Sequence, residues 1–276
     1  MLSLPKGMNE HYGRNVDGMP ELLGAGEVPV SVSGIIQSRL RQGDEFPDLW
    51  NNWHYSSDLV VYSKGNDKEV YVFLTVDNKG QITKNGRKAL ELISPDNLAS
   101  NYGAVVEQLK DLGKKGLIKV PRSKITTETY LSKDQILNEQ VWRILARHPD
   151  EVPAGFAEDK ELLKEYIDEV QRRTNESKNM ALYVGDSSKY ETTLKAWFVY
   201  GLVGRSGALG RIGLGDVSGR LLGIAPEALS VPDKGASNIK AYTMADLQAV
   251  DEAMQGLEGI LHPDVLKPFV DLRKKL

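Results

Sequence analysis

The sequence predicts an α+β protein, with a mixed α/β arrangement left open. An N-terminal antiparallel β-meander is expected to pack on helices, and a C-terminal α-rich part is expected to hold a glycine-rich segment. Three observations carry this prediction. Residues 58–83 alternate valine- and aromatic-rich runs with Gly/Asn/Asp turns, apolar residues recur at helical spacing from Ser94 onward, and glycines gather in 201–223.

The 276 residues are expected to divide into three parts. Residues 1–27 are rich in glycine and contain two prolines, which is typical of an arm or loop. Residues 28–178 should contain the β-meander and its helices. A polar loop at 174–178 then marks the boundary to 179–276, which should contain the glycine-rich segment and the C-terminal helices.

The strands are predicted from alternation and from β-branched and aromatic content. Residues 28–36 alternate well enough for a strand, and 58–63 and 69–76 form the clearest antiparallel pair. The apolar run from Val70 to Val76 indicates a strand buried on both faces. Shorter strands are expected at 81–83, 117–120 and 180–184, and residues 190–203 fit a helix or a strand equally well.

The helices are predicted from their start signals and their apolar spacing. Ser94-Pro95 begins one helix, and the capping box Ser132-Lys-Asp-Gln135 begins another that runs to about His148. Residues 157–173 are amphipathic. Two more helices are expected at 243–261 and 263–276. The aromatic cluster Trp50, Trp53, His54 and Tyr55 is expected to fill the core rather than to stack nucleobases.

The glycine-rich segment 201–223 is the leading candidate for a binding site. Glycine recurs at every third position from Gly201 to Gly213, and each glycine costs ~1 kcal/mol in a helix, so an ordinary helix is excluded. Backbone N–H groups without side chains can face an anion, and arginines add bidentate donors. The segment therefore predicts a site for a phosphate-bearing or other anionic small ligand. Its expected residues are Gly204, Arg205, Ser206, Gly207, Gly210, Arg211, Gly213 and Asp216.

A structural interpretation of the same glycines stays open beside the anion site. Glycine lets two backbones approach closely, and Leu209, Ile212 and Leu221 are then plain core residues. Under this hypothesis the protein is a structural or protein-interaction protein without catalysis.

A second alternative is a metal-dependent nuclease. Asp58 begins one strand, and Asp77-Asn-Lys79 follows the next. This pattern resembles the PD-(D/E)xK nuclease core, in which two carboxylates hold Mg²⁺ and a lysine orients the attacking water. The resemblance implies catalytic roles for Asp58, Asp77 and Lys79, with Mg²⁺ as the cofactor. Asp77-Asn-Lys-Gly80 is equally typical of a hairpin turn.

Composition limits the remaining classes of function. The chain has no cysteine, which excludes disulfides and thiolate chemistry, and its four histidines form no metal-binding pair. A formal charge of −3 predicts no general affinity for nucleic acid. No apolar run reaches the ~20 residues of a membrane span, so we expect a cytoplasmic location. The sequence leaves open the ligand, catalytic turnover and homo-oligomerisation.

Overall fold

The computed structural model describes residues 3–63, 66–95, 116–126, 130–184, 193–202, 206–210 and 219–226. The chain divides into compact units at Met1–Ser230 and Val231–Leu276, and all described residues belong to the first. The predicted helices after Ser94 and at 243–261 and 263–276 lie outside the described residues.

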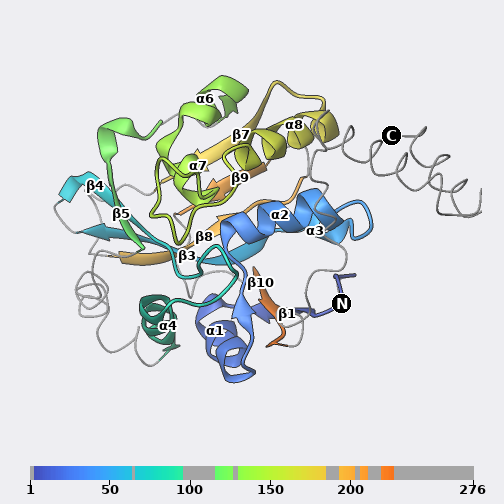
Figure 1. Cartoon of the computed structure of the whole chain (residues 1–276), viewed down its shortest axis with the longest axis vertical. Helices are drawn as coiled ribbons and strands as arrows, with labels where there is room; N and C mark the ends of the chain where they lie inside the picture. The colour runs from blue at the N-terminus through green and yellow to red at the C-terminus, as the bar shows by residue number, and fades with distance from the viewer. Residues whose placement is uncertain are drawn as a thin grey trace, which may run out of the picture. The chain divides into compact units, whose positions relative to one another are not determined.

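One large mixed sheet organises this unit (Figure 1). Its central strands run in the order β1-β10-β3-β8-β9-β7-β6, with β2 on β10 and with β4 and β5 continuing from β3. Two pairs are parallel, β3 with β10 and β7 with β9, and the others are antiparallel. The strands are β1 Met8–Gly13, β2 Val28–Pro29, β3 His54–Ser63, β4 Asn66–Phe73, β5 Leu117–Pro121, β6 Leu131–Ser132, β7 Lys178–Tyr183, β8 Thr193–Val199, β9 Ser206–Leu209 and β10 Gly219–Ile224.

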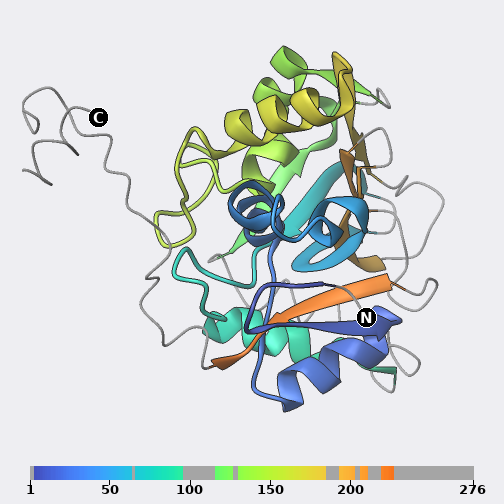
Figure 2. The same cartoon turned by 90° about the vertical axis from the view of Figure 1, so that its right-hand side faces the viewer.

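Helices cover both faces of the sheet, which gives two apolar cores. Trp50, Trp142 and Trp197 belong to one core, and Leu59, Phe73 and Phe198 belong to the other. Figure 2 shows α1 lying along β1 and β10. The helices are α1 Asn15–Gly24, α2 Val32–Gln42, α3 Asp48–Asn51, α4 Lys84–Glu91, α6 Lys133–Asn138, α7 Gln140–Leu145 and α8 Leu162–Thr174, with a 3₁₀ turn at Arg122–Lys124. The expected combination of helices and a sheet is thus confirmed.

Several local predictions are confirmed because short-range chemistry decides them. β3 and β4 form the predicted antiparallel pair. The capping box at Ser132 is present, with both reciprocal bonds to Gln135. The helix that it begins stops at Asn138, because Glu139 is extended, and α7 then restarts. Helix α8 buries the apolar stripe expected of the amphipathic segment.

The predictions for the first 36 residues need correction. The alternation at 28–36 predicted a strand, but only Val28–Pro29 pairs, and α2 begins at Val32. The helix forms in place of the predicted strand because the Ser31 hydroxyl caps it by accepting a hydrogen bond from the Gly34 N–H. Residues 1–27, expected to be an arm or loop, form β1 and α1 instead. β1 pairs with β10, about two hundred residues later in the chain, so no local pattern reveals that strand.

The boundary expected near residue 178 also needs correction. β7 begins at Lys178 and pairs with β6 before it and β9 after it, so one sheet runs through this point. The described parts of the glycine-rich segment are the strands β9 and β10.

A buried ion pair fixes the centre of β3. Asp58 and Arg147 are essentially inaccessible to solvent, and Arg147 Nη2 donates to Asp58 Oδ1 at 2.7 Å. The second carboxylate oxygen accepts from the Val32 N–H at 2.9 Å, at the first turn of α2. Burial raises the pKa of Asp58, and Arg147 and the Val32 N–H act in the opposite direction. The pair therefore ties β3 to the start of α2 and to the turn after α7.

We predict that Asp58→Ala lowers the free energy of unfolding by about 3–5 kcal/mol, because it leaves the Arg147 guanidinium buried without its partner. Urea denaturation followed by circular dichroism measures this. Lys164→Ala is the matched control, because its pair with Glu161 is exposed and worth less than about 1 kcal/mol. Equal effects of the two substitutions would contradict the central role of the buried pair.

Candidate functional site

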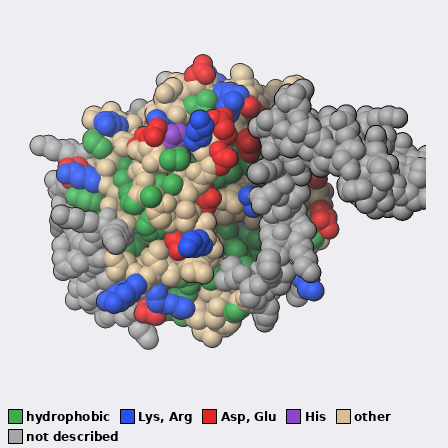
Figure 3. Space-filling model, in the orientation of Figure 1, with side chains coloured by type: hydrophobic (Ala, Val, Ile, Leu, Met, Phe, Trp, Pro, Cys, Tyr) green, Lys and Arg blue, Asp and Glu red, His purple; other side chains and the backbone are tan. Residues whose placement is uncertain are grey.

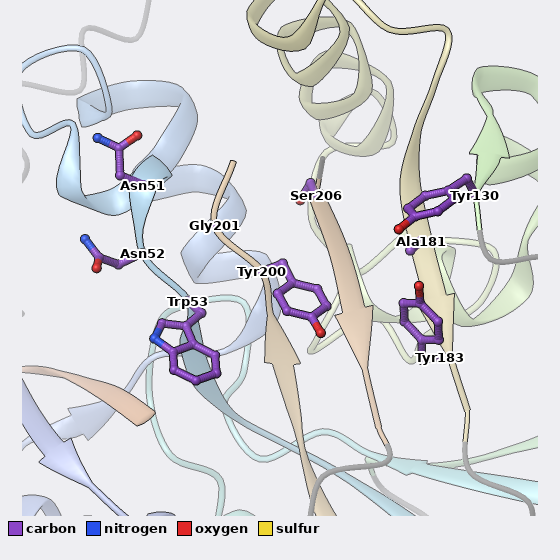
Figure 4. Close-up of a pocket in the computed structure, with 9 residues that line it drawn as sticks. All are labelled: Asn51, Asn52, Trp53, Tyr130, Ala181, Tyr183, Tyr200, Gly201 and Ser206. Carbon is purple, nitrogen blue, oxygen red and sulfur yellow. The ribbon is translucent and has the colours of Figure 1, made fainter. Parts of the chain in front are cut away.

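A pocket of about 630 Å³ lies where the loop after α3 meets the end of β8 and the strands β7 and β9 (Figure 4). This volume is in the range of small-molecule sites. The lining combines four aromatic side chains with small and neutral polar residues. It consists of Asn51, Asn52, Trp53, Tyr130, Ala181, Tyr183, Tyr200, Gly201 and Ser206.

One wall is aromatic and is held from behind by Phe198 of β8. Trp53 meets the buried Phe198 ring edge to face at 5.1 Å between centroids, and Tyr200 does so at 5.6 Å. Figure 4 shows both residues among those that line the pocket, Trp53 just before β3 and Tyr200 at the end of β8. Edge-to-face packing on a fixed core ring orients both side chains before any ligand arrives.

The opposite wall comes from β7 and from the residue before β6. Ala181 and Tyr183 lie two residues apart on β7, so the strand presents both on the same face. Tyr130 reaches in from the segment before β6 (Figure 4). On β9 below them, a Cβ on Gly207 would lie 3.1 Å from Ala181 Cβ and 3.4 Å from Tyr200 Cδ2. The glycine therefore keeps room under the tyrosine ring.

The third side consists mainly of backbone. The Asn51 and Asn52 side chains point away from the aromatic rings in Figure 4, and the Asn52 amide donates to the Asp48 carbonyl at 3.1 Å. Gly201 packs closely on this backbone, because a Cβ there would lie 2.6 Å from the Asn51 oxygen. A side chain at position 201 would therefore push the two segments apart.

Behind this backbone wall lies the buried side chain of Arg39 from α2. It is 1 % exposed, and its guanidinium donates to four neutral acceptors. Nε donates to the Leu49 carbonyl at 2.8 Å, and Nη2 donates to the carbonyls of Asn52 and Tyr200 at 3.1 and 2.8 Å. Nη1 donates to the Tyr166 hydroxyl at 2.6 Å. One cation thus holds two pocket-lining segments and α8 together.

Tyr166 extends this network to the start of β9. Its hydroxyl lies 2.9 Å from Ser206 Oγ, and its ring stacks on Trp50 at 5.7 Å between centroids. The Tyr166 oxygen accepts a hydrogen bond from Arg39, so the Tyr166 hydroxyl proton can be donated to Ser206 Oγ. The buried polar network therefore fixes Ser206 at the pocket as well.

The charge on Arg39 also acts on His54, the first residue of β3. His54 is fully buried, and burial together with the nearby Arg39 cation lowers the pKa of its imidazole to about 3. The side chain is therefore neutral at physiological pH.

The structure describes three of the eight predicted anion-binding residues. Ser206 lines the pocket and Gly207 lies beneath Tyr200. Gly210 packs in the core, where a Cβ would lie 3.0 Å from Trp197, Tyr62 and Val60. Its carbonyl accepts from the Tyr62 hydroxyl at 2.8 Å. The other five, Gly204, Arg205, Arg211, Gly213 and Asp216, lie outside the described residues, so the anion site on this segment stays a prediction.

Two of the three predicted nuclease residues, Asp58 and Asp77, act electrostatically on Arg147, and Asp58 forms an ion pair with it. Asp58 is buried with both oxygens bonded, as described above. Asp77 lies in a turn, where Oδ1 accepts from the N–H groups of Lys79 and Gln81, both at 2.9 Å, and Lys79 is exposed. Across the described ranges, no group of three or more His, Asp or Glu side chains is placed to hold a metal ion. The nuclease hypothesis stays a prediction that these contacts do not favour.

Sequence reasoning missed the pocket itself. The aromatic cluster at Trp50, Trp53, His54 and Tyr55 is predicted to fill the core, and this prediction is confirmed for Trp50, His54 and Tyr55, which are buried. Trp53 is only partly buried, because it packs against the second core and also lines the pocket. Tyr200 lies in residues 190–203, whose sequence fits a helix or a strand equally well, so the direction of its side chain could not be predicted. The signal that could have found the pocket is the concentration of Tyr, Trp, Asn, Ser and Gly near the expected strand ends.

The described surface carries mixed charge. Figure 3 shows lysine and arginine side chains interspersed with aspartate and glutamate on the face in view. No helix among the described residues is long and apolar enough to cross a membrane.

These features define an α+β protein whose mixed sheet carries an aromatic pocket. No family model and no curated protein matches the chain. A solved structure described as "Accommodation of massive sequence variation in Nanoarchaeota by the C-type lectin fold" is similar, with a TM-score of 0.56 and 14 % sequence identity. The match covers 80 % of this chain and 100 % of that one. At this identity the likeness concerns the fold alone.

We predict that stability falls as the pH drops below 6.5, the ordinary pKa of histidine, and that His54 causes part of this loss. The unfolded imidazole takes up a proton near pH 6.5, whereas the folded one does so only near pH 3, so acid favours the unfolded chain. The contribution is about 1.4 kcal/mol per pH unit within that window. Urea midpoints measured from pH 7 to pH 4 should be less pH-dependent in His54→Gln than in the wild type. His148→Gln is the control, and an unchanged slope in His54→Gln would refute the assignment.

We also predict that Arg39→Met destabilises the protein by about 3–5 kcal/mol, because the buried Leu49 carbonyl and the partly buried carbonyls of Asn52 and Tyr200 lose their donor. Thermal and urea unfolding measure the loss. Arg172→Met is the control, since Arg172 is mostly exposed and forms its ion pair with Glu169 within α8. A loss no larger than that of the control would show that Arg39 does not hold these segments together.

Proposed function

We propose that the protein is a binding protein whose pocket holds a small carbohydrate-type ligand, meaning a ring with a flat C–H face and several hydroxyl groups. Aromatic rings such as Trp53 and Tyr200 offer apolar faces to such a ring. Neutral groups such as the Tyr200 hydroxyl both donate and accept hydrogen bonds, which matches the chemistry of ligand hydroxyls.

The composition of the pocket lining is the observation that carries this proposal. Tyr, Trp, Asn, Ser and Gly make up all of the lining residues except Ala181. The same residue types dominate antibody recognition loops, where rigid aromatic groups supply contact area and small polar groups adapt their hydrogen bonds. None of the described lining residues has a carboxylate, imidazole, amine or guanidinium side chain, so recognition is favoured over acid–base catalysis.

The C-type lectin fold named for the similar structure agrees with a binding role, although fold alone does not establish function. In that structure the C-type lectin fold accommodates massive sequence variation. A fold that tolerates variation suits a rigid scaffold that presents a recognition surface.

The anion site on segment 201–223 remains a second candidate, because two residues of that segment, Gly201 and Ser206, line the pocket. Arg205 directly precedes Ser206 in the chain. Under this candidate a phosphate-bearing ligand would bind the wild type, and the double variant Arg205→Ala/Arg211→Ala would lose binding without losing its fold.

We predict that the purified protein binds members of a glycan array, and that Trp53→Ala and Tyr200→Ala each weaken binding of the best ligand about 10- to 100-fold. The reason is that truncating a preoriented aromatic contact removes a large share of the binding energy. Isothermal titration calorimetry gives the dissociation constants.

Tyr12→Ala is the matched control, because Tyr12 is 67 % exposed on β1 and does not line the pocket. All variants are first checked for an unchanged thermal midpoint. The carbohydrate proposal fails if no glycan binds, or if Tyr12→Ala weakens binding as much as the two pocket variants do.

A further inference from the structure

The pocket has a buried positive charge behind its backbone wall. The Arg39 guanidinium is 1 % exposed, and within the part of the chain that the structure describes it forms no ion pair. Its four acceptors are neutral, so they solvate the charge without cancelling it. Charge that stays uncompensated in a poorly solvated region attracts an anion more strongly than the same charge in water does.

Arg39 also determines which way the adjoining peptide groups point. Nη2 binds the carbonyl oxygens of Asn52 and Tyr200. The described chain contains no cis peptide, and in a trans peptide the next N–H points opposite to the carbonyl. The N–H groups of Trp53 and Gly201 therefore point away from Arg39, and both residues line the pocket.

These two N–H groups have no partner among the described residues. Trp53 and Gly201 lie just outside β3 and β8, and neither N–H donates to another described group. By contrast, the neighbouring Tyr200 N–H donates to the Gly207 carbonyl at 3.0 Å, and the Leu202 N–H donates to the Trp50 carbonyl at 2.6 Å. Backbone donors that are left without partners in this way are the usual components of anion-binding concavities.

We propose that the Trp53 and Gly201 N–H groups, with the Arg39 charge behind them, form an acid-binding end of the pocket. This inference rests on the proposed function and narrows its ligand class to sugars that carry a carboxylate or another acidic group. The two N–H groups bind the acidic oxygens, and the aromatic wall stacks on the ring. No arginine of the glycine-rich segment is needed for this selectivity.

The test compares acids with their neutral amides on the wild-type protein. We expect D-glucuronic acid and D-galacturonic acid to bind about tenfold more tightly than D-glucuronamide and D-galacturonamide, because charge-assisted hydrogen bonds are the stronger ones. In ¹⁵N-resolved NMR spectra, the Trp53 and Gly201 amide protons should move downfield with each acid. Acetate should also move them, and acetamide at equal ionic strength should not.

Arg205→Ala/Arg211→Ala is the variant that separates this site from the glycine-rich segment. This variant should still bind acids more tightly than amides. If it has lost that preference, the selectivity comes from the glycine-rich segment and the proposal is overturned. Equal affinity for acids and amides, or unmoved Trp53 and Gly201 signals, would overturn it too while leaving carbohydrate binding intact. If acetate moves both signals and no sugar binds, the acid site stands and the carbohydrate proposal fails.

Discussion

The described pocket depends on the four hydrogen bonds that the buried Arg39 guanidinium donates. It binds the carbonyls of Leu49, Asn52 and Tyr200 and the hydroxyl of Tyr166, so a single side chain joins the loop after α3, the end of β8 and α8. A planar fork with five donors can satisfy these four acceptors at once, whereas a lysine ammonium has only three donors. Arg39 therefore fixes the backbone wall of the pocket, although Arg39 itself does not line the pocket.

A second buried charge acts in the same way at the centre of the sheet. Asp58 binds Arg147 and the first turn of α2, and the register between β3 and β8 shifts between Tyr55 and Leu59, next to Asp58. Such charges rarely add net stability compared with apolar residues, but they admit few alternative arrangements. In this fold they connect segments that lie far apart in the sequence, and local propensity does not specify those connections.

The glycines show how one sequence feature can serve structure and site together. Gly210 lets the end of β9 lie against Trp197 and Tyr62, whereas Gly201 and Gly207 allow close approach beside the pocket. Close packing is thus the demonstrated role of these described glycines, and anion binding by segment 201–223 remains a hypothesis about its arginines. The likeness to the C-type lectin fold is compatible with both roles, since it concerns the fold alone.

The sequence by itself determined the features set by neighbours a few residues apart: the β3–β4 pair, the capping box at Ser132, the apolar stripe of α8 and the exclusion of a helix at β9 and β10. Only the tertiary structure decided that β1 pairs with β10, that one sheet passes through residue 178, and that Trp53, Tyr183 and Tyr200 share a pocket. The physical reason is range. Capping and periodicity act within one or two turns of chain, whereas strand partners and buried charges such as Arg39 are matched across more than a hundred residues.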